Sequence, residues 1–227
     1  MACLVSSNTY DRQETINWAY VAEKAAATFG VIGVMIIVST AFIYPVVVHT
    51  VNLKERGLSL SDRLREFPWV FLDLLFPLLM EQLLSWYVIW ECVLNVLAEL
   101  TRFADRGFYA DWWNSKSWDY YARTWNIPVH NFLLRHAYHS SISAFQLSRT
   151  SATLVTFLLS ACVHELIMMV LFGKIRGYLF VSQMMQLPLV AVSRSRLLKG
   201  KDTLGNVVFW LGLAIGPSLL TSLYLFL

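Results

Sequence analysis

Charged residues are scarce in this sequence of 227 residues, at 15% of the chain, whereas a soluble domain carries about 25%. Hydrophobic residues make up 57%, above the roughly 45–50% that is usual in soluble domains. This balance excludes an ordinary soluble globule, and the aromatic content of 15% excludes a disordered chain. The net charge is only +3 and the basic residues are spread along the chain, which argues against a nucleic-acid-binding protein. The composition indicates a membrane protein.

The signatures of several common sites are also missing. The three cysteines are an odd number, and Cys92 and Cys162 lie in apolar runs, so we predict that both are small buried hydrophobic residues. The sequence has no Cys/His spacing typical of zinc, no glycine-rich phosphate loop and no serine nucleophile elbow. We therefore expect neither a metal site nor a bound cofactor.

Long apolar runs, by contrast, recur along the chain. A bilayer core near 30 Å takes about 20 helical residues, and five runs are candidates for crossing it: Thr28–Thr50, Phe67–Leu100, Ser151–Gly173, the shorter Tyr178–Val192 and Val207–Leu227. The second run would reach roughly 51 Å as one helix, so it must tilt, project from the membrane or break near Pro77. Pro188 predicts a kinked crossing or a re-entrant segment, and Pro217 predicts a kink. We predict an all-α, polytopic membrane protein with four to five transmembrane helices.

The distribution of Lys and Arg predicts the orientation of the loops. Six basic residues lie in Thr101–Thr150, and four more precede the last apolar run: Arg194, Arg196, Lys199 and Lys201. We expect both loops to be cytosolic, because cytosolic loops carry an excess of basic residues. The side on which the 52–66 loop lies stays open. Residues 1–27 form a polar N-terminal segment, and residues 28–227 form the membrane domain.

The Thr101–Thr150 segment is unusually aromatic for a connector between membrane spans. Trp and Tyr mixed with basic residues are typical of amphipathic helices that lie on a membrane surface. One such helix is predicted to be capped by Asn114 or Ser115 and to run to about Thr124.

A second surface helix is predicted directly after the first. Pro128 suits its first turn, Asn126 or Ile127 would cap it, and it would run to about His139. We expect both helices to be cytosolic and interfacial.

Three blocks of sequence resemble a known family. The run Phe108-Tyr109-Ala110-Asp111-Trp112-Trp113-Asn114 matches the Phe-Tyr-x-Asp-Trp-Trp-Asn signature of the sterol and diacylglycerol branch of membrane-bound O-acyltransferases. The run Arg123-Thr124-Trp125-Asn126-Ile127-Pro128-Val129-His130 resembles the next block of that branch, and Val163-His164-Glu165 resembles its intramembrane histidine motif. With the ending Leu204-Gly205-Asn206 to Leu227, the chain is most similar to the C-terminal half of fungal sterol O-acyltransferases.

The resemblance implies acyl transfer from a fatty acyl-CoA to the 3-hydroxyl of a sterol, which forms a steryl ester. It implies acyl-CoA and sterol as substrates, no cofactor, a multi-pass location in the endoplasmic reticulum membrane among its lipids, and no nucleic-acid partner; a homo-oligomer is left open. Two alternatives also stay open. One is a diacylglycerol O-acyltransferase of the same superfamily, and the other is a catalytically silent, truncated fragment that binds lipid or a full-length relative.

His164 is predicted to lie near the middle of its span, where an ionisable side chain is costly and indicates function. From the residues alone it is either a general base, which requires the neutral imidazole that a dry site favours, or a histidine that only bonds a neighbouring helix. The resemblance makes it catalytic. Glu165 lies about 100° further round the helix, so we expect it to contact another helix or the lumenal side. Asn126 is a helix cap by its sequence context and the second catalytic residue by resemblance.

The remaining site predictions also follow from the resemblance. It places five residues along an acyl-CoA tunnel: Trp125, His130, Tyr138, Arg149 and Ser160. For Arg149, an ordinary contact with a lipid headgroup is the alternative. The signature residues either bind CoA or brace the cytosolic helices; they are Phe108, Tyr109, Asp111, Trp112, Trp113 and Asn114. Among them, Asp111 is the better candidate for a structural hydrogen bond.

Overall fold

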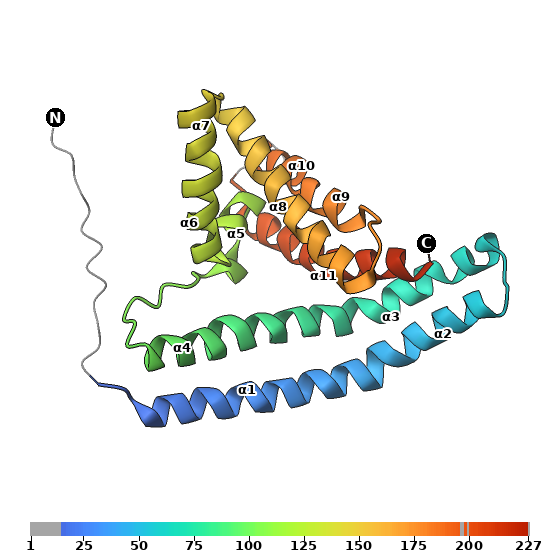
Figure 1. Cartoon of the computed structure of the whole chain (residues 1–227). Coiled ribbons are helices and arrows are strands. Elements are labelled where there is room, and N and C mark those ends of the chain that lie inside the picture. The colour runs from blue at the N-terminus through green and yellow to red at the C-terminus, as the bar shows by residue number, and fades with distance from the viewer. Residues whose placement is uncertain (1–14, 196–197, 199, 227) are drawn as a thin grey trace. The chain divides into compact units, whose positions relative to one another are not determined.

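The computed structural model describes residues 15–195, 198 and 200–226. Over these residues the chain forms helices joined by loops, drawn in Figure 1. They belong to two compact units, one made of residues 15–39 and 80–107 and the other of residues 40–79 and 108–226. Arg196 and Lys199, predicted to be cytosolic, lie outside the described residues, as does the start of the predicted polar segment.

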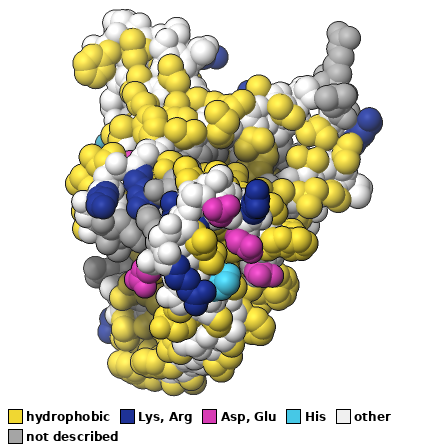
Figure 2. Space-filling view, turned by 90° about the vertical axis from the view of Figure 1, so that its right-hand side faces the viewer, with side chains coloured by type: hydrophobic (Ala, Val, Ile, Leu, Met, Phe, Trp, Pro, Cys, Tyr) yellow, Lys and Arg dark blue, Asp and Glu magenta, His cyan; other side chains and the backbone are white. Residues whose placement is uncertain are grey.

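Four helical stretches are long and apolar enough to cross a membrane: Trp18–Leu53, Leu60–Leu100, Arg149–Val170 and Asp202–Phe226. A shorter apolar stretch covers Tyr178–Ser193. The prediction of an all-α chain with four to five spans is confirmed. Hydrophobic side chains cover much of the face shown in Figure 2, as expected of a surface that packs against lipid rather than water.

The first unit pairs the first helix with the end of the second stretch. Helix α1 (Trp18–Val38) packs against the π-helical turn η2 (Tyr87–Val93) and against α4 (Leu94–Leu100). Three glutamates of the second stretch bond this first helix or its cap: Glu81 accepts from Ser39 Oγ at 2.8 Å, Glu91 from Lys24 Nζ at 2.6 Å and Glu99 from the Asn17 N–H at 2.6 Å. Polar contacts therefore fix how these two membrane helices align.

Of the three alternatives given for the second run, a break near Pro77 is not found. Helix α3 (Leu60–Trp86) contains both Pro68 and Pro77 and continues into η2 and α4, giving 41 helical residues, or about 61 Å. The irregularity of this stretch is the π-helical turn instead. The first stretch is also one continuous run of helix with a π-helical turn inside it: α1 continues through η1 (Ser39–Ile43) into α2 (Tyr44–Glu55). Such turns absorb a local mismatch in the ladder without ending a helix.

In the second unit, the last helix packs on the beginning of α3. The core of this contact consists of Val70, Leu74 and Phe226, and the ring of Phe226 meets that of Phe67 edge to face at 5.5 Å. Helix α11 (Asp202–Phe226) runs through Pro217 without ending.

The third stretch turns back on itself. Helix α8 (Arg149–Phe172) packs against α9 (Tyr178–Met184), which is followed by α10 (Gln186–Ser193). The two short helices meet at Met185, three residues before Pro188. Proline has no N–H for the carbonyl four residues earlier, so the predicted irregularity takes the form of a junction between two helices.

The Thr101–Thr150 segment forms helices where two were predicted, with different bounds. In order, its helices are η3 (a 3-10 turn, Trp112–Asn114), α5 (Trp118–Thr124), α6 (Ile127–Leu133), η4 (π-helical, Leu134–His139) and α7 (Ser140–Phe145). The second predicted helix therefore continues past His139 to Phe145.

The predicted caps of these helices are right in one case and wrong in the other. Asn126 caps α6, as expected. Helix α5 is capped by Ser117, not by Asn114 or Ser115: its side chain accepts from the Tyr120 N–H at 3.4 Å. The reason is that residues 112–114 already form their own 3-10 turn, so the helix begins later.

The prediction for the cysteines is also half right. Cys92 is fully buried, whereas Cys162 is exposed. Cys162 occupies the same outer surface of α8 as Leu158, Leu159 and Leu166, which are exposed as well. An apolar run in a spanning helix includes a face toward lipid, so residence in such a run does not establish burial within the protein.

The ion pair between Lys24 and Glu91 should be needed for the stability of the first unit. We expect Lys24→Met to lower the free energy of unfolding by about 1–3 kcal/mol, because the partly buried carboxylate of Glu91 loses its partner. Exchange of the two charges, Lys24→Glu with Glu91→Lys, should recover most of this loss. Unfolding by SDS in mixed micelles measures it.

The matched control is Glu23→Gln, a change at the exposed neighbouring position, which should alter the unfolding free energy by less than about 0.5 kcal/mol. An exchange variant as unstable as Lys24→Met would contradict the prediction.

Candidate active site

His164 is held in one tautomer by its own helix. Its side chain is half-buried on α8, and Nδ1 lies 2.7 Å from the backbone carbonyl oxygen of Ser160, one turn earlier. A carbonyl oxygen can only accept, so Nδ1 carries the proton of this bond. In the neutral ring, the lone pair is then on Nε2, which is the atom able to take a proton from a substrate.

Glu165 does not orient His164. Its carboxylate accepts the backbone N–H groups of Gly177 at 2.6 Å, Phe180 at 3.0 Å and Arg176 at 3.2 Å, where α9 begins. This confirms the expectation that Glu165 contacts another helix. Two adjacent residues of the motif thus have separate tasks, because Glu165 fixes the turn between α8 and α9 while the imidazole of His164 points to a different side.

Arg176 extends this anchor to the last helix. Its guanidinium donates to the carbonyl oxygen of Tyr224 at 2.8 Å and lies 5.4 Å from the centre of that ring. The end of α8, the start of α9 and the end of α11 are therefore joined around one carboxylate and one guanidinium.

Asn126 is buried, with 7% of its surface exposed. Its Oδ1 accepts the N–H of Val129 at 3.1 Å and so caps α6. Backbone bonds fix the chain on both sides: the Ile127 N–H donates to the Phe108 carbonyl, and the Ala110 N–H donates to the Thr124 carbonyl, each at 2.9 Å. The cap uses Oδ1 alone, so the two N–H groups of the same amide are not consumed by it.

Each of the two predicted catalytic residues is positioned by its own surroundings. In the portion of the chain that the structure describes, no hydrogen bond joins His164 to Asn126. Helix α8 does pack against η4 and α7, which continue from the helix that Asn126 caps (Figure 1). The catalytic roles of both residues stay predictions.

The aromatic signature is docked onto α11. Trp112 is buried, meets the rings of Trp113 and Tyr121 edge to face at 6.0 Å, and lies 6.1 Å from the ring of Trp210. The carbonyl oxygen of Trp113 accepts from Trp210 Nε1 at 3.1 Å and from Asn206 Nδ2 at 3.0 Å. Of the two roles considered for this signature, these contacts support bracing of the cytosolic helices.

Asp111 makes the structural hydrogen bond that was predicted for it. The hydroxyl of Tyr120 donates to Asp111 Oδ1 at 2.5 Å. This bond lowers the pKa of Asp111 below its usual value and raises the pKa of Tyr120. Tyr109, another signature residue, meets Trp113 edge to face at 6.4 Å.

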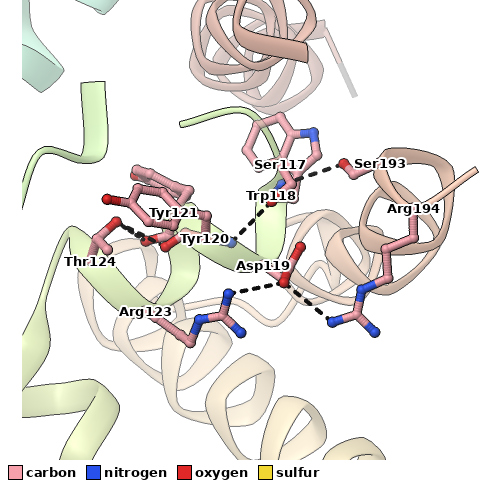
Figure 3. A network of polar contacts seen from close by, with 9 residues as sticks. All are labelled: Ser117, Trp118, Asp119, Tyr120, Tyr121, Arg123, Thr124, Ser193 and Arg194. Atoms are coloured by element: carbon pink, nitrogen blue, oxygen red, sulfur yellow. Dashed lines mark hydrogen bonds and ion pairs between the residues drawn. The ribbon is translucent and has the colours of Figure 1, made fainter. Parts of the chain in front are cut away.

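Helix α5 is also tied to the end of α10, as Figure 3 shows. Asp119 forms ion pairs with Arg123 at 3.1 Å and with Arg194 at 3.3 Å. The backbone N–H of Trp118 donates to Ser193 Oγ at 3.4 Å. Two of these contacts, to Arg194 and Ser193, join the start of α5 to the end of α10, while the pair with Arg123 lies within α5 itself.

The residues predicted to line the acyl-CoA tunnel come from four elements, and His130 is the one that lies in α6. Trp125, which ends α5, stacks on Tyr121 at 5.9 Å, and burial raises the pKa of Tyr121 to about 12. Tyr138 lies in η4, where it meets His139 edge to face. Arg149 is exposed at the first turn of α8, and Ser160 of the same helix presents its carbonyl to His164. Whether acyl-CoA binds them stays a prediction.

Sequence reasoning did not single out the partners of the aromatic signature on α11. The loop packs on Asn206, Trp210 and two glycines of that helix, which follow it by some ninety residues in the sequence. A usable signal was present: Gly205 and Gly212 are two helical turns apart and so share one face.

These features define a class of protein. The chain is a multi-pass helical membrane protein with a histidine within one span and an aromatic segment docked on the last span. It belongs to the membrane-bound O-acyltransferase family, whose family model matches residues 5–226.

Relatives within this family agree over nearly the whole chain. Sterol O-acyltransferase 2 of Saccharomyces cerevisiae is 46% identical over 223 residues, which cover 98% of this chain and 35% of that protein. Probable sterol O-acyltransferase 1 of Schizosaccharomyces pombe is 42% identical, over 98% of this chain and 40% of that protein. Diacylglycerol O-acyltransferase 1 of Dictyostelium discoideum is 30% identical, over 97% of this chain and 34% of that protein. The chain thus spans 34–40% of the length of these relatives.

The capping carboxylate leads to a first prediction for this site. Glu165→Gln keeps the size of the side chain but replaces one accepting oxygen by an NH₂ group that faces backbone N–H groups. We expect the free energy of unfolding to fall by about 1–3 kcal/mol, with faster hydrogen exchange at Gly177 and Phe180. Equal exchange at these two amides in both proteins would contradict the assignment. Gln183→Glu, a change on α9 away from this turn, is the control.

His130 leads to a second prediction. Burial, and then the nearby charge of Arg123, hold the pKa of His130 below its usual 6.5. Arg123→Gln should raise that pKa toward 6.5 without reaching it, because the burial remains. Because the pKa of His130 is lower in the folded chain than in the unfolded chain, its contribution to stability is fully present above pH 6.5 and is lost as the pH falls through the folded pKa. Arg123→Gln brings the two pKa values closer, so the variant should lose less stability on acidification.

An NMR titration of His130 in micelles measures the shift, with Arg135→Gln at an exposed position of η4 as control. A pKa that Arg123→Gln leaves in place would contradict the assigned cause.

Proposed function

We propose that this chain carries the acyl-transfer centre of a sterol O-acyltransferase. The centre would move a fatty acyl group from acyl-CoA to the 3-hydroxyl of a sterol. The observation that carries the proposal is the tautomer of His164, whose Nδ1 is engaged by the Ser160 carbonyl. It is supported by membership of the acyltransferase family and by similarity to sterol O-acyltransferases over 98% of the chain.

In the proposed reaction, Nε2 of His164 takes the proton of the sterol hydroxyl as its oxygen attacks the thioester carbonyl. The tetrahedral intermediate then collapses, the carbon–sulfur bond breaks, and the CoA sulfur leaves with the proton returned by the imidazolium. The products are a steryl ester and free CoA. General base catalysis of this kind contributes about 10²–10⁴-fold in rate.

Asn126 suits the second role, which is to stabilise the oxyanion of that intermediate. An amide N–H held by a rigid cap is a preorganised donor, and such a donor contributes about 10²–10³-fold. The cap in question is the bond from the Val129 N–H to Asn126 Oδ1.

The acyl-CoA would lie along Trp125, His130, Tyr138, Arg149 and Ser160. Arg149 is exposed at the start of α8, where its guanidinium can meet a phosphate. The burial that lowers the pKa of His130 favours a neutral side chain there, which suits contact with an uncharged acyl or pantetheine portion. The chemistry proceeds without a metal or prosthetic group, and we place it in the endoplasmic reticulum membrane.

A second candidate is acyl transfer to diacylglycerol. It is favoured by the 30% identity to a protein named diacylglycerol O-acyltransferase 1. The lower identity, compared with 42–46% for the sterol enzymes, ranks it second.

Lipid analysis of cells that lack neutral-lipid synthesis tests the proposal. Expression of the chain should yield steryl esters, and His164→Ala should lower their rate of formation about 10²–10⁴-fold. Cys162→Ala, on an exposed face of the same helix, is the matched control and should not change the rate.

The other outcomes are equally informative. Triacylglycerol in place of steryl ester would transfer the proposal to the second candidate. The absence of both products would identify a catalytically silent fragment, and a His164→Ala variant as active as the unchanged chain would remove His164 from the chemistry.

A further inference from the structure

Two glycines of α11 lie where the chain leaves no room for a side chain. A Cβ atom added to Gly212 would come closer than 3.0 Å to Cζ2 of Trp118 and within 3.0 Å of its Cη2. A Cβ atom added to Gly205 would come closer than 3.0 Å to the carbonyl oxygen of Lys116. Real Cβ atoms essentially never approach so closely, so only glycine allows this contact without displacement.

Both contacts are on one face of the helix, because seven residues make about two turns. The same helix donates Asn206 Nδ2 to the carbonyl oxygens of Trp113 and Ser115, each at 3.0 Å. Further along, the ring of Phe209 meets that of Trp118 at 5.4 Å. The residues around Trp118 therefore contact α11 over about two turns, from Gly205 to Gly212, and not at one point.

A displacement of Trp118 has a short path to Asn126. Helix α5 is only seven residues long, and Trp125, stacked on Tyr121, ends it directly before Asn126. Helix α5 is also joined to the end of α10, by the ion pair from Asp119 to Arg194 and by the bond from the Trp118 N–H to Ser193 Oγ. We therefore expect a side chain added on α11 to rotate or tilt α5 and the residues that follow.

We propose that Gly212 and Gly205 are positioning residues for the acyl-transfer centre, acting through Trp118 and α5 on Asn126. The inference rests on the proposed function for its catalytic consequence. It goes beyond that function in assigning a role to the last span, which supplies neither of the two catalytic residues.

The test is Gly212→Ala in the full chain. We expect kcat for acyl transfer to fall on the order of 10–100-fold, since a displacement of about 1 Å at a catalytic group can cost 10²-fold. The KM for acyl-CoA should change far less, because an interaction made only in the transition state is lost. The double variant Gly212→Ala, Trp118→Phe removes Cζ2 and Cη2 of the indole and should recover most of the lost kcat.

The control is Gly216→Ala, one turn further along the same helix, where nothing lies within 4 Å of an added Cβ. It should leave kcat unchanged. Hydrogen exchange gives a second measurement that does not require activity. Exchange at the Ile127 and Val129 amides should rise in Gly212→Ala and return toward the starting rate in the double variant.

These two measurements separate the proposals. A chain that is inactive in all forms would end the proposed function, while the exchange pattern would still support or refute the positioning role. Gly212→Ala with unchanged kcat and exchange would overturn that role, and so would a loss that Trp118→Phe fails to recover.

Discussion

Hydrocarbon offers no hydrogen-bond partners, so each polar side chain within a spanning helix must be satisfied by the protein itself. At the histidine motif of α8, this chain meets that constraint with short local bonds. Nδ1 of His164 donates to a carbonyl one turn earlier, and Glu165 accepts three backbone N–H groups at the start of α9. The same constraint thus selects the tautomer of the imidazole and fixes the turn that follows its helix. It also explains why adjacent polar residues of one motif have different tasks.

Outside the spans, the order of the helices in the Thr101–Thr150 segment depends on a different kind of contact. The aromatic signature has a buried Trp112 at its centre and two carbonyl oxygens bonded by Asn206, so its backbone and not only its rings is recognised by α11. Helix α5 is too short to be stable alone, because isolated helices need about 12–15 residues. Its position is therefore set by one ion pair to Arg194, at the end of α10, and by the packing of its rings on α11.

Much of this was predictable from local sequence, and the misses have separate causes. The spans follow from the length of apolar runs, the cap at Asn126 from an amide two residues before proline, and the separate direction of Glu165 from the 100° step of a helix. The cap at Ser117 could not be foreseen. The turn formed by residues 112–114 is hydrogen-bonded to α11, which is some ninety residues away in the sequence. A break at Pro77, one of three alternatives for that run, is not found, and the irregularity of the stretch is a π-helical turn ten residues later, which has no simple sequence signal.

The two predicted catalytic residues show how a structural bond and a chemical role can coexist in one side chain. His164 uses Nδ1 to bond its helix and retains Nε2, while Asn126 uses Oδ1 to cap α6 and retains its N–H groups. In both, the polar atom that faces the protein fixes the orientation of the atom that would face the substrate. The choice between helix cap and catalytic residue, or between helix bond and general base, is therefore not a true alternative. The hydrogen bond that stabilises the fold would also orient the reactive atom toward the substrate.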